Sequence, residues 1–214
     1  VERDGSLRHA ASYHALTAEV VSPILQGVAG YEEVMKVTEV LTRVGATTNR
    51  TTGLHVHVEA SDLTGEEVAR VVEFYTANQT AIDTMVSASR RNNRYANKYP
   101  AFRVASMKQA VAAQQGNKEA LRGYANKYTV VKIAPLFTYG TIEFRQHQGS
   151  VNGKKITNWI KFVQAVVDAA QVAGDLDTAV EAEAMLNNLV SKKVLAEEAA
   201  TYLKTRPVAI APGR

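Results

Sequence analysis

Hydrophobic and polar residues alternate in short segments of the chain, and a period of two is typical of β-strands with one buried face. Segment 17–21 alternates in this way and places Glu19 on one side. In segment 54–58 the same period sends His55 and His57 to one face and the apolar residues to the other. We therefore expect two strands, each with a polar face that carries potential ligands.

A second pair of strands is expected at 128–135 and 141–147, with a turn around Tyr139-Gly140 between them. Two β-like segments joined by a short glycine-containing turn are typical of a hairpin. On the second strand Glu143 and Arg145 are two residues apart, so they share a face. The pattern predicts a small antiparallel sheet.

Apolar residues at helical spacing occupy most of the remaining chain. Thr64 with Glu67 has the signature of a capping box, Asn152 can cap a later helix, and Gly174 can end it. The expected helices cover residues 31–44, 64–89, 104–116, 152–174, 177–190 and 192–204. The fold class is α+β, with a main domain at 1–174, a helical C-terminal extension at 175–205 and a flexible tail at 206–214.

The composition is that of an ordinary globular protein. With 214 residues and 46% hydrophobic content, the chain can bury a core. It contains no cysteine, so disulfides, thiolate nucleophiles and sulfur-based metal sites are excluded. No apolar run approaches the ~18 residues of a membrane helix, and no signal peptide is recognisable. We expect a cytoplasmic protein that does not enter a membrane.

Positive charge is concentrated in the middle of the chain. Between Asp83 and Asp168 the only acids are Glu119 and Glu143, whereas the same stretch holds 14 lysines and arginines. Such a distribution favours an anionic partner. Nucleic acid, a nucleoside triphosphate or an acidic substrate would each satisfy it, so charge alone does not choose among them.

The two strand histidines are the first candidate for chemistry, because two imidazoles on one face can share a metal or a metal-bound phosphate. Two exposed or hydrogen-bonded histidines would give the same pattern. Glu143 beside Arg145 supports a site, since a carboxylate binds a divalent cation and a guanidinium binds phosphate, although an isolated ion pair is the alternative. Glu19 on another strand supplies a further oxygen.

A basic loop follows the helix at 64–89 and contains Arg90, Arg91, Arg94 and Tyr95. A solvated run of charge is one interpretation, and recognition of a substrate carboxylate is the other. Nucleic-acid binding is the weakest hypothesis, because few aromatic residues in this loop offer stacking. The pentapeptide Tyr-Ala-Asn-Lys-Tyr begins at Tyr95 and again at Tyr124, but five residues are too few to indicate a duplication.

Five motifs in order resemble those of the amidoligases, in the superfamily of glutamine synthetase and glutamate-cysteine ligase. The motifs are Asp4-Gly5-Ser6, Glu19-Val20-Val21-Ser22-Pro23, Gly53-Leu54-His55-Val56-His57-Val58, Ser89-Arg90-Arg91-Asn92 and Thr141-Ile142-Glu143-Phe144-Arg145. The resemblance covers about residues 4–159. It implies that the main domain is catalytic and that its sheet is the curved antiparallel sheet of the glutamine-synthetase type, flanked by helices.

The resemblance also implies roles for individual residues. Glu19, His55 and Glu143 would ligate Mg²⁺ or Mn²⁺, and His57 and Arg145 would contact the phosphates of ATP. Arg91 and Arg145 would be catalytic, while Arg90, Arg91, Arg94 and Tyr95 would hold the carboxylate substrate. The implied reaction is ATP-dependent: a carboxylate is converted to an acyl phosphate, which an amine then attacks to give an amide or isopeptide bond.

One part of the family pattern is missing, because no strand with Glu-x-Glu precedes Asp4. We expect that strand upstream of Val1. The alternatives are that another segment replaces that strand, or that the protein has impaired catalysis and keeps the fold as a binding or assembly component. The sequence does not identify the carboxylate and amine substrates, and it leaves a homo-oligomer open.

Overall fold

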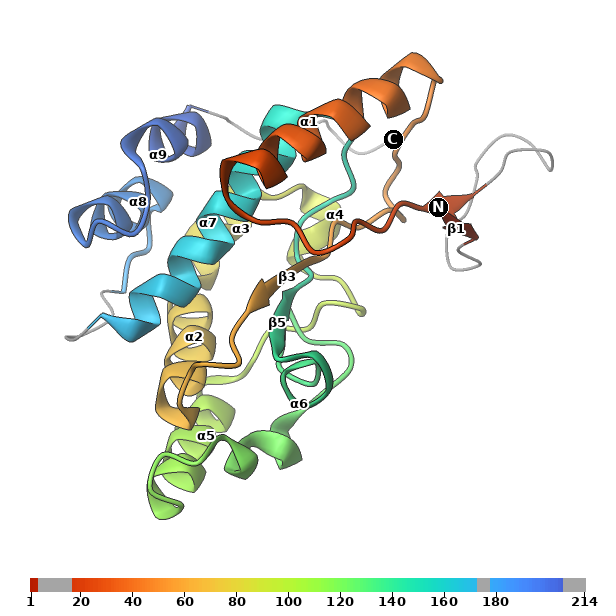
Figure 1. The fold of residues 1–214 in the computed structure, drawn as a ribbon. Helices are drawn as coiled ribbons and strands as arrows, with labels where there is room; N and C mark the ends of the chain where they lie inside the picture. Colours follow the sequence, from red (N-terminus) through yellow and green to blue (C-terminus); the bar gives the residue numbers. More distant parts are fainter. Residues whose placement is uncertain (4–16, 173–177, 206–214) are drawn as a thin grey trace. The chain divides into compact units, whose positions relative to one another are not determined.

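The computed structural model describes residues 1–3, 17–172 and 178–205 (Figure 1). Several sequence-based expectations lie outside these residues: the Asp4-Gly5-Ser6 motif, the helix stop at Gly174 and the flexible tail at 206–214. The chain divides into two compact units, Val1–Leu54 with Gln148–Thr157, and His55–His147 with Asn158–Arg214. The domain limits expected from the sequence stay a prediction.

The first unit contains a short antiparallel pair and one long helix. Strand β1 (Glu2–Arg3) pairs with β2 (Ala18–Glu19), and α1 runs over Gly27–Arg43. The segment at 148–157 belongs to this unit: the N–H of Gly149 donates to the carbonyl oxygen of Thr52 at 3.0 Å. The expected strand around Glu19 is present, although it is only two residues long.

The second unit is mostly helical. Its helices are α2 (Gly65–Ala77), α3 (Gln79–Met85), α4 (Ala88–Arg91), α5 (Ala101–Ala113), the 3-10 helix η1 (Lys118–Tyr124), α6 (Leu136–Tyr139), most of α7 (Gly153–Gln171), α8 (Ala182–Ser191) and α9 (Glu197–Lys204). Both expected caps are present, at Thr64 with Glu67 and at Asn152. None of the helices in the described ranges is both long and apolar enough for a membrane span.

The sheet of the second unit has three antiparallel strands in the order β3-β5-β4. They are β3 (Val56–Glu59), β4 (Val131–Lys132) and β5 (Thr141–Phe144). Strand β5 is central and pairs with both neighbours, as Figure 1 shows for β3 and β5. The predicted pairing of the two later strands is confirmed, and the fold mixes helices with a small open antiparallel sheet.

Alternation along β5 separates a core face from a polar face. Ile142 and Phe144 are fully buried, and the ring of Phe144 lies 5.8 Å from that of Tyr75 on α2. Glu143, between them, points to the opposite face. Packing of Phe144 against α2 therefore fixes which side of the sheet carries the candidate site.

Two helical details differ from the sequence-based expectation. The helix expected over 64–89 is divided, because Asn78 ends α2 and begins α3 and its side-chain amide donates to the carbonyl oxygen of Phe74 at 2.9 Å. The connection before β5 is the short helix α6, which ends at Gly140 in a left-handed conformation with φ 71°. A turn was expected there, but four residues of helix precede the glycine.

Replacing Gly140 tests how the start of β5 is fixed. An alanine there would adopt an unfavourable positive φ, and its Cβ would lie 3.0 Å from Cβ of Ser61. We expect Gly140→Ala to lower the free energy of unfolding by about 1–3 kcal/mol. Gly123→Ala is the control, because nothing lies within 4 Å of its Cβ. Urea unfolding followed by Trp159 fluorescence measures both, and equal stabilities would contradict the expectation.

Candidate functional site

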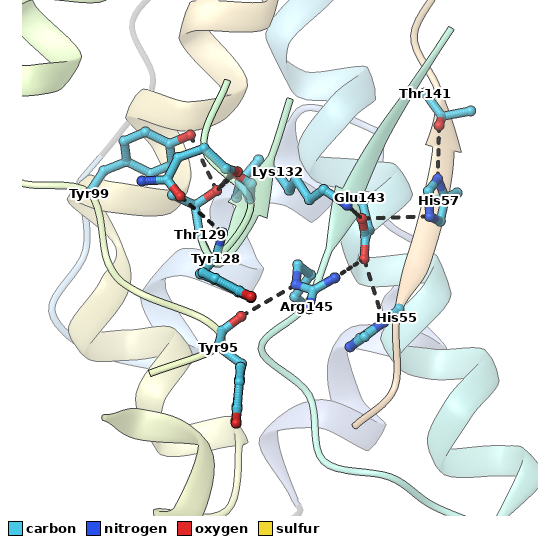
Figure 2. A network of polar contacts seen from close by, with 12 residues as sticks. His55, His57, Tyr95, Tyr99, Tyr128, Thr129, Lys132, Thr141, Glu143 and Arg145 are labelled. Carbon is cyan, nitrogen blue, oxygen red and sulfur yellow. Dashed lines mark hydrogen bonds and ion pairs between the residues drawn. The ribbon is translucent and has the colours of Figure 1, made fainter. Parts of the chain in front are cut away.

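The strand register places three polar side chains in a row across the sheet. Glu143 on β5 lies directly opposite His57 on β3 and opposite Lys132 on β4. Residues directly opposite in antiparallel strands project from the same face. His55 and Arg145 continue this face, two residues from His57 and Glu143 respectively. We call His55, His57, Lys132, Glu143 and Arg145 the Glu143 cluster, and Figure 2 shows these side chains turned towards one another.

Glu143 is the centre of the cluster and is buried, with 4% of its side chain exposed. Its Oε2 accepts a hydrogen bond from Nζ of Lys132 at 2.6 Å, and its Oε1 pairs with a guanidinium nitrogen of Arg145. Burial alone would raise the pKa of Glu143, but the hydrogen bond from Lys132 and the charge of Arg145 outweigh it, so the pKa is lowered. The carboxylate is therefore ionised at neutral pH.

The two imidazoles approach different oxygens of this carboxylate. Nδ1 of His55 lies 3.5 Å from Oε1, and Nε2 of His57 lies 3.8 Å from Oε2. The other ring nitrogen of His57, Nδ1, is hydrogen-bonded to Oγ1 of Thr141 at 2.9 Å. Burial, together with Arg145, lowers the pKa of His55 to about 4, and burial also lowers the pKa of His57. At neutral pH His55 is thus uncharged.

Positive charge exceeds negative charge around His55. Arg145, Lys132 and Arg90 all act on its pKa as cations, and Glu143 is the one carboxylate among the causes of that shift. With His55 neutral, the groups that act on it comprise three positive charges and one negative charge. An arrangement of this kind favours a bound anion, and both phosphate and carboxylate match the geometry of an arginine side chain.

Arg90 supports the cluster from within the protein. Its side chain is buried, with 4% exposure for the residue, and its guanidinium donates to the carbonyl oxygens of Gln146 at 3.1 Å and Arg145 at 2.5 Å. Both acceptors directly follow β5. Arg90 therefore fixes the backbone from which the Arg145 side chain extends.

A buried amide network lies beside this point. Gln146 is fully buried, and its side chain donates to Asp83 at 2.7 Å and accepts from Gln79 at 3.0 Å. Asp83 also pairs with Lys98. The network anchors the residue that follows Arg145 to α3, so both backbone and side-chain contacts hold the end of β5 in place.

The remaining arginines and Tyr95, expected to hold a substrate, occupy different surroundings. Arg91 on α4 donates to the carbonyl oxygen of Val86 at 3.4 Å. Arg94 is exposed and stacks over the ring of Tyr95, with 4.7 Å between its guanidinium carbon and the ring centre. The carbonyl oxygen of Tyr95 accepts a hydrogen bond of 3.4 Å from Nε of Arg145, which connects this loop to the Glu143 cluster.

The expected metal ligands belong to different units. His55 and Glu143 meet, whereas Glu19 lies in the first unit, opposite Glu2 in the β1-β2 pair. Within the described ranges, no group of three or more His, Cys, Asp or Glu side chains is arranged to hold a metal ion. Both oxygens of Glu143 already contact cations, so neither is free to ligate a metal within the described cluster. The metal set of Glu19, His55 and Glu143 stays a prediction.

Lys132 is the cluster member that sequence reasoning did not select. It lies on a correctly expected strand and belongs to the basic stretch, but nothing in its neighbours distinguishes it from 13 other cations. Only the pairing of Lys132 with Glu143 across β4 and β5 reveals its role. The available signal was the expected hairpin, which pairs the strand that carries Lys132 with the strand that carries Glu143.

Comparison with known proteins assigns the family. The model of the family described as "Putative amidoligase enzyme" matches residues 1–167, which is more than half of the chain. The chain therefore belongs to this amidoligase family, and the resemblance noted from the motifs is confirmed. Membership indicates a ligase-type function. No curated protein and no solved structure matches the chain.

The protonation of His55 provides a direct test of the electrostatic description. In an NMR titration towards low pH, we expect the imidazole of His55 to stay neutral until about pH 4. Its signal is assigned by its absence from the spectrum of His55→Asn. The unfolded chain takes up this proton near pH 6.5 and the native protein does not. Stability should therefore fall as the pH drops from about 6.5 to about 4. Titration of His55 near pH 6.5 would contradict the description.

Removal of Arg90 tests its supporting role. Arg90→Met deletes two hydrogen bonds from a charged donor and leaves buried carbonyl oxygens without it, so we expect a loss of about 3 kcal/mol or more in unfolding free energy. Arg70→Met is the matched control, since Arg70 lies near the surface, where it donates a bond of 2.8 Å to the carbonyl oxygen of Val172. Its cost should be about 1 kcal/mol or less. Equal losses, measured by urea unfolding, would show that Arg90 is not a special support.

Proposed function

We propose that the protein is an ATP-dependent ligase that forms an amide or isopeptide bond between a carboxylate and an amine. The observation that carries this proposal is the Glu143 cluster, in which two cations, Lys132 on β4 and Arg145 just after β5, pair with a single carboxylate. Family membership supports a ligase, and the excess of positive charge supports a polyphosphate as the source of energy. The cluster lies on the polar face of the sheet, where side chains from three strands meet.

The proposed reaction has two steps. An oxygen of the substrate carboxylate attacks the terminal phosphorus of ATP, the bond to the bridging oxygen breaks, and ADP leaves with that electron pair. The amine nitrogen then attacks the acyl carbon, phosphate leaves, and the nitrogen loses a proton. Charge on the transferring phosphoryl group is what the protein must stabilise in the first step.

The cluster has the groups that the first step needs. Arg145 and Lys132 would face the phosphate oxygens, and Arg145 is the better suited of the two to bind them at two points. Glu143 holds these two cations in place by pairing with both. A neutral imidazole such as that of His57 can donate one N–H to a phosphate oxygen without adding charge.

We propose that the substrate carboxylate is bound beside the cluster by Arg91, which ends α4 and directly precedes the loop that carries Arg94 and Tyr95. What supports this placement is the loop contact between Tyr95 and Arg145, and the exposure of Arg94. Arg90 is less available to bind substrate, because its guanidinium is buried and donates to backbone carbonyl oxygens. The carboxylate and amine themselves are not identified by these residues.

The full fold and the cofactors belong to the same proposal. The central strand β5, with antiparallel neighbours and helix α2 behind it, is compatible with one part of a curved sheet of the glutamine-synthetase type. Mg²⁺ or Mn²⁺ would accompany ATP as the usual counter-ion of its phosphates. A cytoplasmic location stays a prediction.

A binding or assembly protein without catalysis is the second candidate. One observation favours it: both oxygens of Glu143 are paired with cations, so the described cluster offers no ready carboxylate for a metal. On this alternative the cluster would be a structural ion-pair network. The two candidates differ in whether the cluster binds a nucleotide.

Calorimetric titration with ATP and Mg²⁺ tests the proposal. We expect the parent chain to bind, and Arg145→Met or Lys132→Met to weaken binding by about tenfold or more, because each removes a charged contact to phosphate worth about 1.5–3 kcal/mol. Lys108→Met is the control, since Lys108 pairs with Glu73 on α2. Thermal unfolding checks that each variant is folded.

A folded parent chain that binds no nucleotide would contradict the ligase and favour the assembly protein. Release of ADP only when both a carboxylate and an amine mixture are present would extend the support from binding to the reaction. If Arg145→Met and Lys132→Met bind ATP as tightly as the parent chain and the Lys108→Met control, the Glu143 cluster is not the phosphate site.

A further inference from the structure

The repeated pentapeptide, which the proposed function does not use, acquires a meaning in the structure. Its two copies, which begin at Tyr95 and Tyr124, lie side by side: the N–H of Asn97 donates to the carbonyl oxygen of Tyr128 at 2.6 Å, and the N–H of Val130 donates to that of Asn97 at 2.9 Å. This pairing joins Asn97, the middle residue of the first copy, to Tyr128, the last residue of the second. The rings of Tyr95 and Tyr128 have centres 5.8 Å apart and are inclined at 67°.

Both of these tyrosines are exposed to solvent although their rings are in contact. Tyr95 is 44% exposed and Tyr128 is 38% exposed. Each is accompanied by a cation: Arg94 lies 4.7 Å from the ring centre of Tyr95, and Nζ of Lys127 lies 5.3 Å from that of Tyr128. Exposed aromatic rings interleaved with basic side chains are the arrangement with which proteins stack nucleobases near phosphate groups.

The aromatic pair is connected to the Glu143 cluster. Nε of Arg145 donates to the carbonyl oxygen of Tyr95 at 3.4 Å, while the other end of the same guanidinium pairs with Glu143. Figure 2 shows Tyr95 and Tyr128 on the side of Arg145 that faces away from Glu143. Arg145 therefore lies between Glu143 and the two exposed rings.

We propose that Tyr95 and Tyr128, with Arg94 and Lys127 beside them, bind the base of the nucleotide whose phosphates face the Glu143 cluster. This inference rests on the proposed function, because it requires a nucleotide at that cluster. The base stacks on a tyrosine ring, and the guanidinium of Arg94, which lies 4.7 Å from the ring centre of Tyr95, can stack on the base in turn. The uncharged base is stabilised by stacking on the rings, whereas the charged phosphates are stabilised by the cations. The two parts of the nucleotide are therefore bound by different residues.

The division between base and phosphates can be measured with two ligands. Calorimetry on the full chain compares ATP with inorganic tripolyphosphate, both with Mg²⁺, because tripolyphosphate has the phosphates and lacks the base. We expect Tyr95→Leu and Tyr128→Leu to weaken ATP binding by about five- to a hundredfold and to change tripolyphosphate binding by less than about twofold. Tyr95→Phe, which keeps the ring, should bind ATP like the parent chain.

Tyr139→Leu is the matched control, since Tyr139 on α6 is a tyrosine with 73% exposure. It should bind both ligands as the parent does. If the parent binds both ligands and the Tyr95 and Tyr128 variants bind ATP equally well, the proposed base site is wrong while the phosphate site stands. Parallel loss of ATP and tripolyphosphate binding would also overturn the base site. A parent that binds neither ligand would overturn the nucleotide function itself, and the base site with it.

Discussion

A carboxylate buried on the central strand of a small sheet is the constraint on which the rest of this structure depends. Removing a charged carboxylate from water costs several kcal/mol unless opposite charges and hydrogen bonds replace the lost hydration. Lys132 from one neighbouring strand and Arg145, which directly follows β5, do so at Glu143. The pairing in turn requires the register that places Glu143 opposite both Lys132 and His57.

The same pairing creates the chemical character of the site. Glu143 neutralises only part of the positive charge that surrounds it. Arg90, which donates to the carbonyl oxygens of the residues after β5, adds a third cation. Burial and these cations keep His55 neutral, so the imidazole does not add to the repulsion. A site that holds cations close together by means of one buried acid is prepared for a polyphosphate, and the cost of assembling the charges is met by folding before the ligand arrives.

Local sequence patterns predicted most residues of the site, but they missed one member of the cluster and the burial of a supporting arginine. Alternation at His55 and His57 and at Glu143 and Arg145 gave the correct strands and faces, and five ordered motifs gave the family. Lys132 was missed because register is a long-range property that alternation on one strand does not contain. The burial of Arg90 was missed for the same reason: a basic run at the end of a helix reads as solvated, and only the carbonyl groups after β5 show where its guanidinium lies.

The central claim is that the cations held by Glu143 receive the phosphates of a nucleotide. A crystal structure of the chain with Mg²⁺ and a non-hydrolysable ATP analogue tests it most directly. The account predicts phosphate oxygens in hydrogen-bond contact with Arg145 and Lys132 on the polar face of the sheet. An analogue bound elsewhere, with the Lys132–Glu143–Arg145 pairing undisturbed and facing only solvent, would contradict it.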